Sequence, residues 1–97
     1  MYKLRAETIR KINQILALLK QAEGEIHLRG IAKTLNMYPQ TVSRIIDNYL
    51  SIFVDIRSIE EFGFRAKLIR IKPGKEGVSI GDVMKYIAVK ERMKPSR

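Results

Sequence analysis

Residues 28–46 (LRGIAKTLNMYPQTVSRII) constrain the fold more than any other segment, because two short helical patterns meet there with almost no sequence between them. The apolar residues of the first pattern recur at helical spacing, which predicts a helix over 29–35. Asn36 follows, and asparagine tolerates the left-handed backbone of a sharp reversal better than other residues with a β-carbon. Pro39 opens the second pattern, and its fixed φ suits a first helical position. This segment therefore predicts two packed helices joined by a tight turn.

The second of these helices is predicted over 39–51 and divides into an apolar and a polar side. The apolar side contains Val42, Ile45, Ile46, Tyr49 and Phe53. The polar side contains Gln40, Thr41, Arg44, Asp47, Asn48 and Ser51. Such a division is typical of a helix that packs one face on a core and exposes the other.

Helical patterns also stand near the two ends of the chain. Apolar residues recur at three- and four-residue steps over 9–19, which predicts a first helix that ends near Gly24. Ser79 precedes Asp82 by three residues, a weak form of the capping box, and this pair predicts the start of a last helix over 79–93.

Residues 52–72 predict a β-hairpin. Apolar and polar residues alternate before a turn near Gly63, and the chain then returns as a second strand. The alternation slips at Leu68 and Ile69, which indicates either a bulge or burial on both faces of the strand. Residues 25–28 are too short to assign and are either a loop or a brief strand.

Together these elements predict a single α+β domain over 1–97, mainly α, with a three-helix core, a two-stranded hairpin and a C-terminal helix. The chain contains no cysteine, which excludes disulfides and thiolate zinc sites. No apolar run approaches the ~18 residues that span a bilayer, and no secretory signal opens the chain, so we expect a cytoplasmic protein. Abundant isoleucine and charge with little Asn or Gln is typical of a thermophile, and we expect an archaeal source.

Nineteen Lys and Arg residues stand against ten Asp and Glu, which gives a net charge of +9. This excess is spread over both halves of the chain. A basic folded domain attracts phosphate through long-range charge, so we expect a nucleic-acid partner. The alternative is a basic surface that only maintains solubility.

The order helix, helix–turn–helix, hairpin, helix resembles the winged helix–turn–helix proteins, particularly small prokaryotic and archaeal transcription regulators of the MarR and ArsR kind. Residues 28–50 form the helix–turn–helix in this comparison and 52–72 the wing. Ile31, Ala32 and Leu35 fit the packed first helix, and the run Thr41-Val42-Ser43-Arg44 matches the common opening of the recognition helix. Outside the helix–turn–helix the resemblance is one of architecture.

The resemblance implies a sequence-specific, double-stranded-DNA-binding transcription regulator that reads the major groove with helix 39–51. The base-reading candidates are Gln40, Thr41, Arg44 and Asn48. Arginine can donate two hydrogen bonds to guanine, and Gln or Asn can pair with adenine. The phosphate-binding candidates are Arg29, Lys33, Tyr38, Ser43, Arg57, Arg65, Lys67, Lys72 and Lys75. For each of them the alternative is an ordinary solvated side chain.

Three positions depart from the family pattern. Tyr38 stands where a Ser or Thr commonly caps the recognition helix. Gly30 lies inside a helix, where it suggests close approach of another backbone. Glu60 and Glu61 stand near the hairpin tip, where they would repel the phosphates that a basic wing binds.

The terminal helices show apolar arcs of roughly half a turn, wider than the ~100° stripe that packing on one core requires. We therefore expect a homodimer, as in many members of the family. The candidate interface residues are Leu4, Leu18, Ile80, Met84, Tyr86, Ile87, Val89 and Met93. The alternative is that the two helices pack on each other within one chain.

His27 is the single histidine, and without cysteine it makes a transition-metal site only if carboxylates complete the ligand set. No nucleophile–base pair or glycine-rich phosphate loop is present, so we expect no enzyme activity, no cofactor and no metal. Two other functions remain open. One is a sequence-neutral chromatin or architectural protein, and the other is a winged-helix module that binds RNA or protein.

Overall fold

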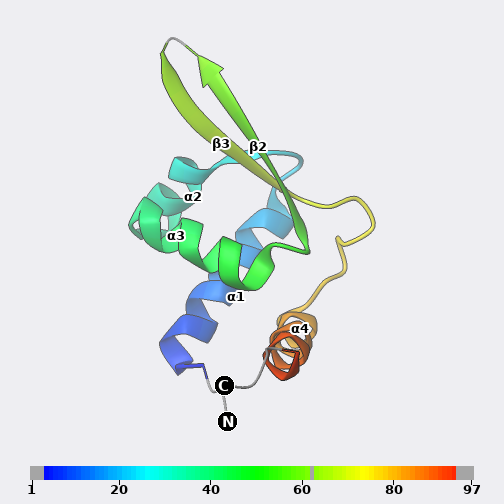
Figure 1. Ribbon diagram of the computed structural model, residues 1–97. Helices are drawn as coiled ribbons and strands as arrows, with labels where there is room; N and C mark the ends of the chain where they lie inside the picture. The colour runs from blue at the N-terminus through cyan, green and yellow to red at the C-terminus, as the bar shows by residue number, and fades with distance from the viewer. Residues whose placement is uncertain (1–3, 62, 94–97) are drawn as a thin grey trace.

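The computed structural model describes residues 4–61 and 63–93. Its fold is α+β and mainly helical (Figure 1). In chain order its elements are α1 (Ala6–Gln21), β1 (Ile26–His27), α2 (Leu28–Leu35), α3 (Pro39–Ile45), the π-helical turn η1 (Ile46–Leu50), β2 (Val54–Glu61), β3 (Phe64–Ile71) and α4 (Ile80–Arg92). The predicted helices are therefore present, and the helix predicted over 39–51 is divided into α3 and η1.

One face of α1 forms the centre of the hydrophobic core. Its four buried side chains, none more than 2% exposed, are Ile12, Ile15, Leu16 and Leu19. They recur at three- and four-residue steps, so helical geometry places them on one side. Full burial of an Ile or Leu side chain stabilises a fold by ~1.5–3 kcal/mol. This face therefore holds α1 against α2, α3 and the sheet.

A tight turn joins α2 to α3, as predicted. Asn36 has φ 56° and ψ 49°, which is left-handed backbone, and the Met37 N–H donates to the Ala32 carbonyl at 2.8 Å. Pro39 is the first residue of α3, as expected. The close backbone approach expected at Gly30 is not found, because a β-carbon there would meet only side-chain atoms of Ile26 and His27 at ordinary distances of 3.7 and 3.8 Å.

The prediction of a two-stranded hairpin is incomplete, because the sheet has three antiparallel strands in the order β1-β3-β2. β1 contributes two residues, with Ile26 opposite Ile69 and His27 opposite Leu68. The segment left open as a loop or a strand is thus a strand. A strand of two residues leaves no periodic pattern in the sequence, and it is recognised only through its pairing with β3.

β2 and β3 pair without interruption, so the bulge considered for β3 is not present. Leu68 and Ile69 are 9% and 1% exposed although they face opposite sides of the sheet. β3 is flanked there by both other strands, where the sheet is widest. Burial on both faces therefore explains the slip in alternation. Gly63 adopts a positive φ of 79° in the predicted turn, and Phe62 of that turn lies outside the described residues.

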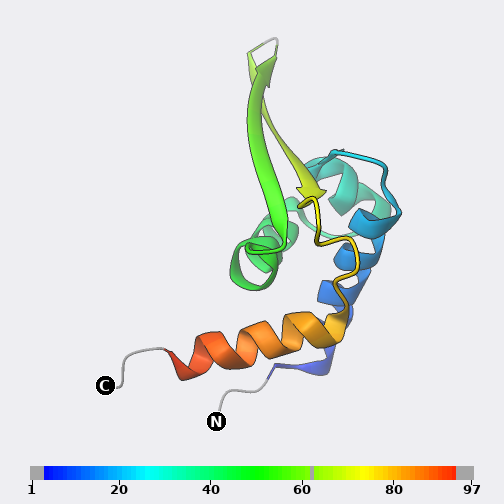
Figure 2. The same cartoon turned by 90° about the vertical axis from the view of Figure 1, so that its right-hand side faces the viewer.

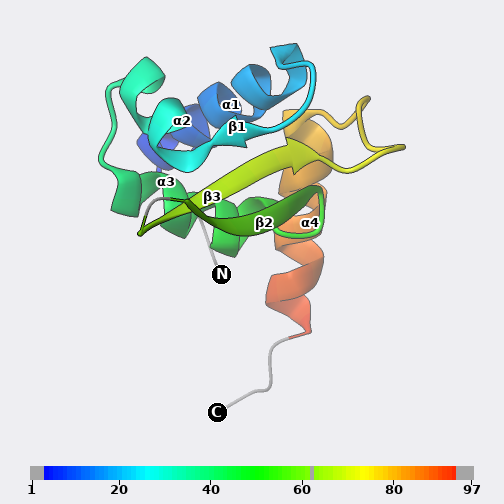
Figure 3. The same cartoon turned by 90° about the horizontal axis from the view of Figure 1, so that it is seen from above.

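α4 lies at the opposite end of the molecule from the hairpin (Figures 1 and 2). The predicted capping box is confirmed, since the Asp82 N–H donates to Ser79 Oγ at 3.2 Å and the Ser79 N–H donates to the Asp82 carboxylate at 3.0 Å. Lys20 Nζ donates to the Val78 carbonyl at 2.8 Å and ties the end of α1 to the segment before α4. The C-terminal end of α4 extends beyond the other helices (Figure 3).

Candidate nucleic-acid interface

The polar face of α3 and η1 is accessible. Gln40, Arg44 and Asn48 are exposed, and Thr41 is half-buried. The opposite face is buried in the core, with no side chain more than 5% exposed, and consists of Val42, Ile45, Ile46 and Leu50. The predicted base-reading residues therefore lie together on one side of the continuous helical segment formed by α3 and η1, and Thr41 is the least accessible of them.

The π-helical turn η1 includes Asn48 and was not visible in the sequence. A π-turn uses i→i+5 hydrogen bonds and is frequent at functional sites. Lys90 Nζ from α4 donates to the backbone carbonyl of Asn48 at 3.2 Å and lies 5.8 Å from the centroid of the Tyr86 ring. The Tyr86 ring meets Phe53 edge to face, at 5.7 Å between centroids and 85° between planes. α4 thus contacts the turn that carries Asn48.

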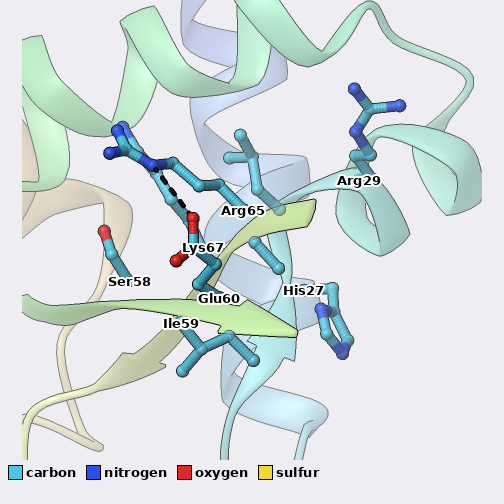
Figure 4. A pocket seen from close by; sticks show the side chains of 9 residues that line it. His27, Arg29, Ser58, Ile59, Glu60, Arg65 and Lys67 are labelled. Atoms are coloured by element: carbon cyan, nitrogen blue, oxygen red, sulfur yellow. Dashed lines mark ion pairs between the residues drawn. The ribbon is translucent and has the colours of Figure 1, made fainter. Parts of the chain in front are cut away.

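The strand register divides the hairpin side chains between two faces. We name the face that contains the core residue Ile69 the inner face, and the other the outer face. Toward the tip, the inner face consists of Ser58, Glu60, Arg65 and Lys67. Figure 4 shows these four side chains on one side of the hairpin ribbon and Ile59 on the other. The inner face therefore presents two cations and one acid.

The inner face lies next to the helix that carries the base-reading candidates. A small cleft is lined by Ser43 and Asp47 from α3 and η1 and by Lys67 from β3. Arg65 Nε lies 4.0 Å from Glu60 Oε2, and both side chains are mostly exposed, at 89% and 68%. So long and exposed an ion pair contributes little, so Arg65 remains available to a partner. Lys67 forms no ion pair with any residue that the structure describes.

Arg57 lies on the outer face, away from these two cations. Its Nη2 donates to Glu25 Oε1 at 2.7 Å and its Nε donates to Oε2 at 3.0 Å. These hydrogen bonds hold the pKa of Glu25 below its ordinary value and raise the pKa of Arg57. The charge of Arg57 is therefore already compensated, which makes it the weakest of the phosphate candidates.

The other phosphate candidates fall into two groups. Arg29 and Lys33 are exposed on α2, and Tyr38, at 78% exposed, directly precedes α3. Lys72 and Lys75 lie in the loop after β3, at the end of the sheet away from the turn between α2 and α3 (Figures 1 and 3). The first group thus lies on α2 and at the start of α3, and the loop lysines lie apart from it.

The chain matches no protein-family model and no curated protein. Over residues 4–61 and 63–93, no cluster of three or more His, Cys, Asp and Glu side chains is placed to hold a metal ion, and His27 is exposed before α2. None of the described helices is both long and apolar enough to cross a bilayer.

The candidate dimer residues differ in accessibility. Val89 and Met93 near the end of α4 are 50% and 77% exposed. Ile87 is 6% exposed within the protomer core, so it is not available to a partner. The remaining candidates are half-buried and pack against the core, and they are Leu4, Leu18, Ile80, Met84 and Tyr86. A dimer contact would therefore be centred on the last two turns of α4.

Proposed function

We propose that this protein is a winged helix–turn–helix transcription regulator that binds double-stranded DNA and reads the major groove with α3 and η1. The observation that carries the proposal is the shared exposed face of Gln40, Arg44 and Asn48, opposite a face that is buried in the core. Arginine discriminates guanine, and glutamine or asparagine discriminates adenine, through paired hydrogen bonds in the major groove. A helix with this face outward meets the geometric requirement for base reading.

The order of the elements supports the same proposal. A helix, two helices joined by a tight turn, a hairpin and a last helix follow one another in the described chain. This is the order on which the resemblance to winged-helix proteins rests. The added strand β1 joins the base of the hairpin and leaves that order unchanged.

Phosphate contacts would come from cations around α3. Arg65 and Lys67 on the inner face and Lys33 on α2 are exposed and have no strong acidic partner among the described residues. Such contacts fix the register of a protein on DNA and carry most of the salt dependence of binding. Glu60 lies beside Arg65 on the same face, so it would reduce the attraction of phosphate there.

The protein would act as a homodimer, with the exposed apolar end of α4 as the centre of the contact. Two-fold symmetry would then select an inverted repeat whose half-sites lie about one helical turn apart. The hairpin and α4 lie at opposite ends of the protomer, so this contact would leave the hairpin free (Figure 2).

Selection from a random duplex library at physiological salt, followed by affinity measurements on the selected and on random DNA, tests the proposal. Arg44→Ala is expected to remove ~1–3 kcal/mol, or about 5- to 150-fold in affinity, at the selected site only. Lys67→Ala is expected to weaken binding to all duplexes and to reduce the salt slope by about one. Lys85→Ala, on exposed α4, is the charge-matched control.

Equal loss of affinity on selected and random DNA in Arg44→Ala would contradict base reading. Selection of no sequence, with strong binding to every duplex, would favour a sequence-neutral architectural protein. No binding to duplex DNA at low salt would favour a module for RNA or protein. The exposed apolar positions of the hairpin, Phe64 at 76% and Ile56 at 42%, favour the protein-binding form of this last alternative.

A further inference from the structure

The backbone edge of β3 is only partly covered. β1 pairs with Ile69 and Leu68 alone, and the chain then leaves the sheet because α2 begins at Leu28. Among the residues that the structure describes, the outer part of β3 over 64–66 therefore has a strand partner on its β2 side only. A free strand edge presents unpaired N–H and C=O groups to any segment that can lie alongside it.

The hydrogen-bond pattern identifies the unpaired groups. The Lys72 N–H donates to the Phe53 carbonyl at 3.0 Å, which makes these two residues a hydrogen-bonded antiparallel pair. Such pairs recur at every second residue, so the even-numbered residues of β3 direct their N–H and C=O toward β2. The odd-numbered residues direct theirs toward β1. Ile69 faces Ile26 there, and continuation of the same register places Leu28 opposite Lys67, whereas the backbone groups of Arg65 have no strand partner in the described chain.

A groove runs along this edge. Its volume is about 520 Å³, and Leu28 and Arg29 at the start of α2 form one wall. Arg65, Ala66 and Lys67 of β3, together with Ser58, Ile59 and Glu60 of β2, form the other. Figure 4 shows Arg65 and Lys67 on one side of the hairpin and Ile59 and His27 on the other. The groove therefore has a cationic side and a less polar side along a single strand edge.

Successive side chains of β3 point alternately to the inner and to the outer face of the hairpin. The inner-face positions Arg65 and Lys67 are cationic, and Glu60, already within 4.0 Å of Arg65, is the one acid among the described side chains that line the groove. The outer-face positions of β3 over 64–68 are apolar, with Ala66 paired to Ile59 and with Phe64 76% exposed. An added strand places each of its residues directly opposite one residue of β3, on the same face.

We propose that this edge binds an extended segment of a partner protein, in which acidic residues alternate with apolar ones, as a fourth strand antiparallel to β3. An acidic residue of the segment lies opposite Arg65 and within diagonal reach of Lys67 on the same face, and an apolar residue lies opposite Ala66. Backbone hydrogen bonds hold the strand, and the alternating side chains select it. A second copy of the chain does not fit, because pairing two β3 edges would oppose like charges. Lys and Arg on a free edge repel further copies, and the same charges attract an acidic strand.

The peptide site stands without the DNA interface. One consequence rests on the proposed function: a bound acidic strand occupies Arg65 and Lys67, so it would compete with duplex DNA. The partner protein would then weaken or prevent DNA binding without contacting α3.

The probe is an eight-residue peptide of alternating Glu and Val, acetylated, amidated and fluorescently labelled, titrated with the full chain at 0.15 M salt and followed by anisotropy. Three other probes serve as controls: a Glu–Val peptide with the same residues in two blocks, a Lys–Val alternating peptide, and an eight-nucleotide single-stranded DNA. Saturable binding of the alternating acidic peptide is expected, with weaker binding of the block peptide and none of the Lys–Val peptide. Amide shifts in a ¹⁵N spectrum should centre on residues 64–67 and the start of α2.

Variants locate the site. Arg65→Gln is expected to weaken binding of the acidic peptide by about 5-fold, since an opposite-charge cross-strand pair contributes up to ~1 kcal/mol. Arg65→Pro also removes the N–H that faces the groove and is expected to weaken peptide binding further. Circular dichroism checks that both variants fold. Lys85→Gln on α4 should change nothing.

Equal affinity for the block and alternating peptides, or shifts elsewhere than along β3, would overturn the proposal. So would shifts at this edge with the single-stranded DNA but not with the peptide, which would assign the groove to nucleic acid. Competition between peptide and duplex is measured separately, on the selected DNA. Peptide binding in a protein that binds no duplex would leave the strand site in place and remove only its regulatory consequence.

Discussion

Replacement of Lys90 by Met tests whether α4 stabilises the end of the proposed recognition helix. Methionine keeps the length and apolar stem of lysine but loses both the hydrogen bond to the Asn48 carbonyl and the ammonium near the Tyr86 ring. An exposed cation–π contact contributes about 0.5–1 kcal/mol. The hydrogen bond from Lys90 to the Asn48 carbonyl is exposed, so in the variant water partly replaces it and its loss adds little. A loss of ~1 kcal/mol in local stability corresponds to about 5-fold faster amide exchange.

Native-state hydrogen exchange followed by NMR measures this effect, and the faster exchange is expected in η1 and the turn up to Phe53. Arg92→Met is the matched control, because Arg92 is also a cation in the last turn of α4 and so shares the same interaction with the helix dipole. Unchanged exchange in η1, or equal acceleration by Arg92→Met, would refute the view that Lys90 holds this turn.

Two further predictions concern the other local contacts. Ser79→Ala removes the hydroxyl that accepts from the Asp82 N–H and is expected to cost ~1 kcal/mol, or about 4–8 °C in melting temperature; an equal shift from Ser51→Ala would contradict it. Glu25→Gln is expected to lower the free energy of unfolding at neutral pH. The lowered pKa of Glu25 means that its ionised form stabilises the fold. The difference in the free energy of unfolding between parent and variant should therefore shrink as the pH falls below 4.5, the ordinary pKa of the carboxyl, and through its lowered pKa. A difference that stays constant in an acid titration would exclude this carboxylate as its source.

Much of the fold could be predicted because its signals are local. The apolar steps of α1, the Asn36 turn, Pro39 at the start of α3 and the Ser79 cap each require only a few consecutive residues. β1 could not be assigned, because its two residues form a strand only through their pairing with β3, more than forty positions later in the chain. The π-turn was also hidden, since η1 carries the same apolar spacing as a continuous α-helix.

The candidate site divides in the same way. The exposure of Gln40, Arg44 and Asn48 followed from helical periodicity, which needs no tertiary information. The pairing of Arg57 with Glu25 across 32 positions, and the contact of Lys90 with Asn48 across 42, follow from how distant segments meet. A charge count treats every arginine alike, so it did not separate compensated Arg57 from available Arg65.

The third strand ends well before the hairpin does, so the outer half of β2 and β3 is a two-stranded arm anchored only at its base. Its length can therefore change without disturbing the interior of the protein. Insertion of one residue in each strand preserves their pairing but turns the side chains of the tip to the opposite face of the arm. Insertion of two residues in each strand restores the original orientation and lengthens the arm by about 7 Å. Homologous proteins with arms of different length are thus expected to differ by even numbers of residue pairs.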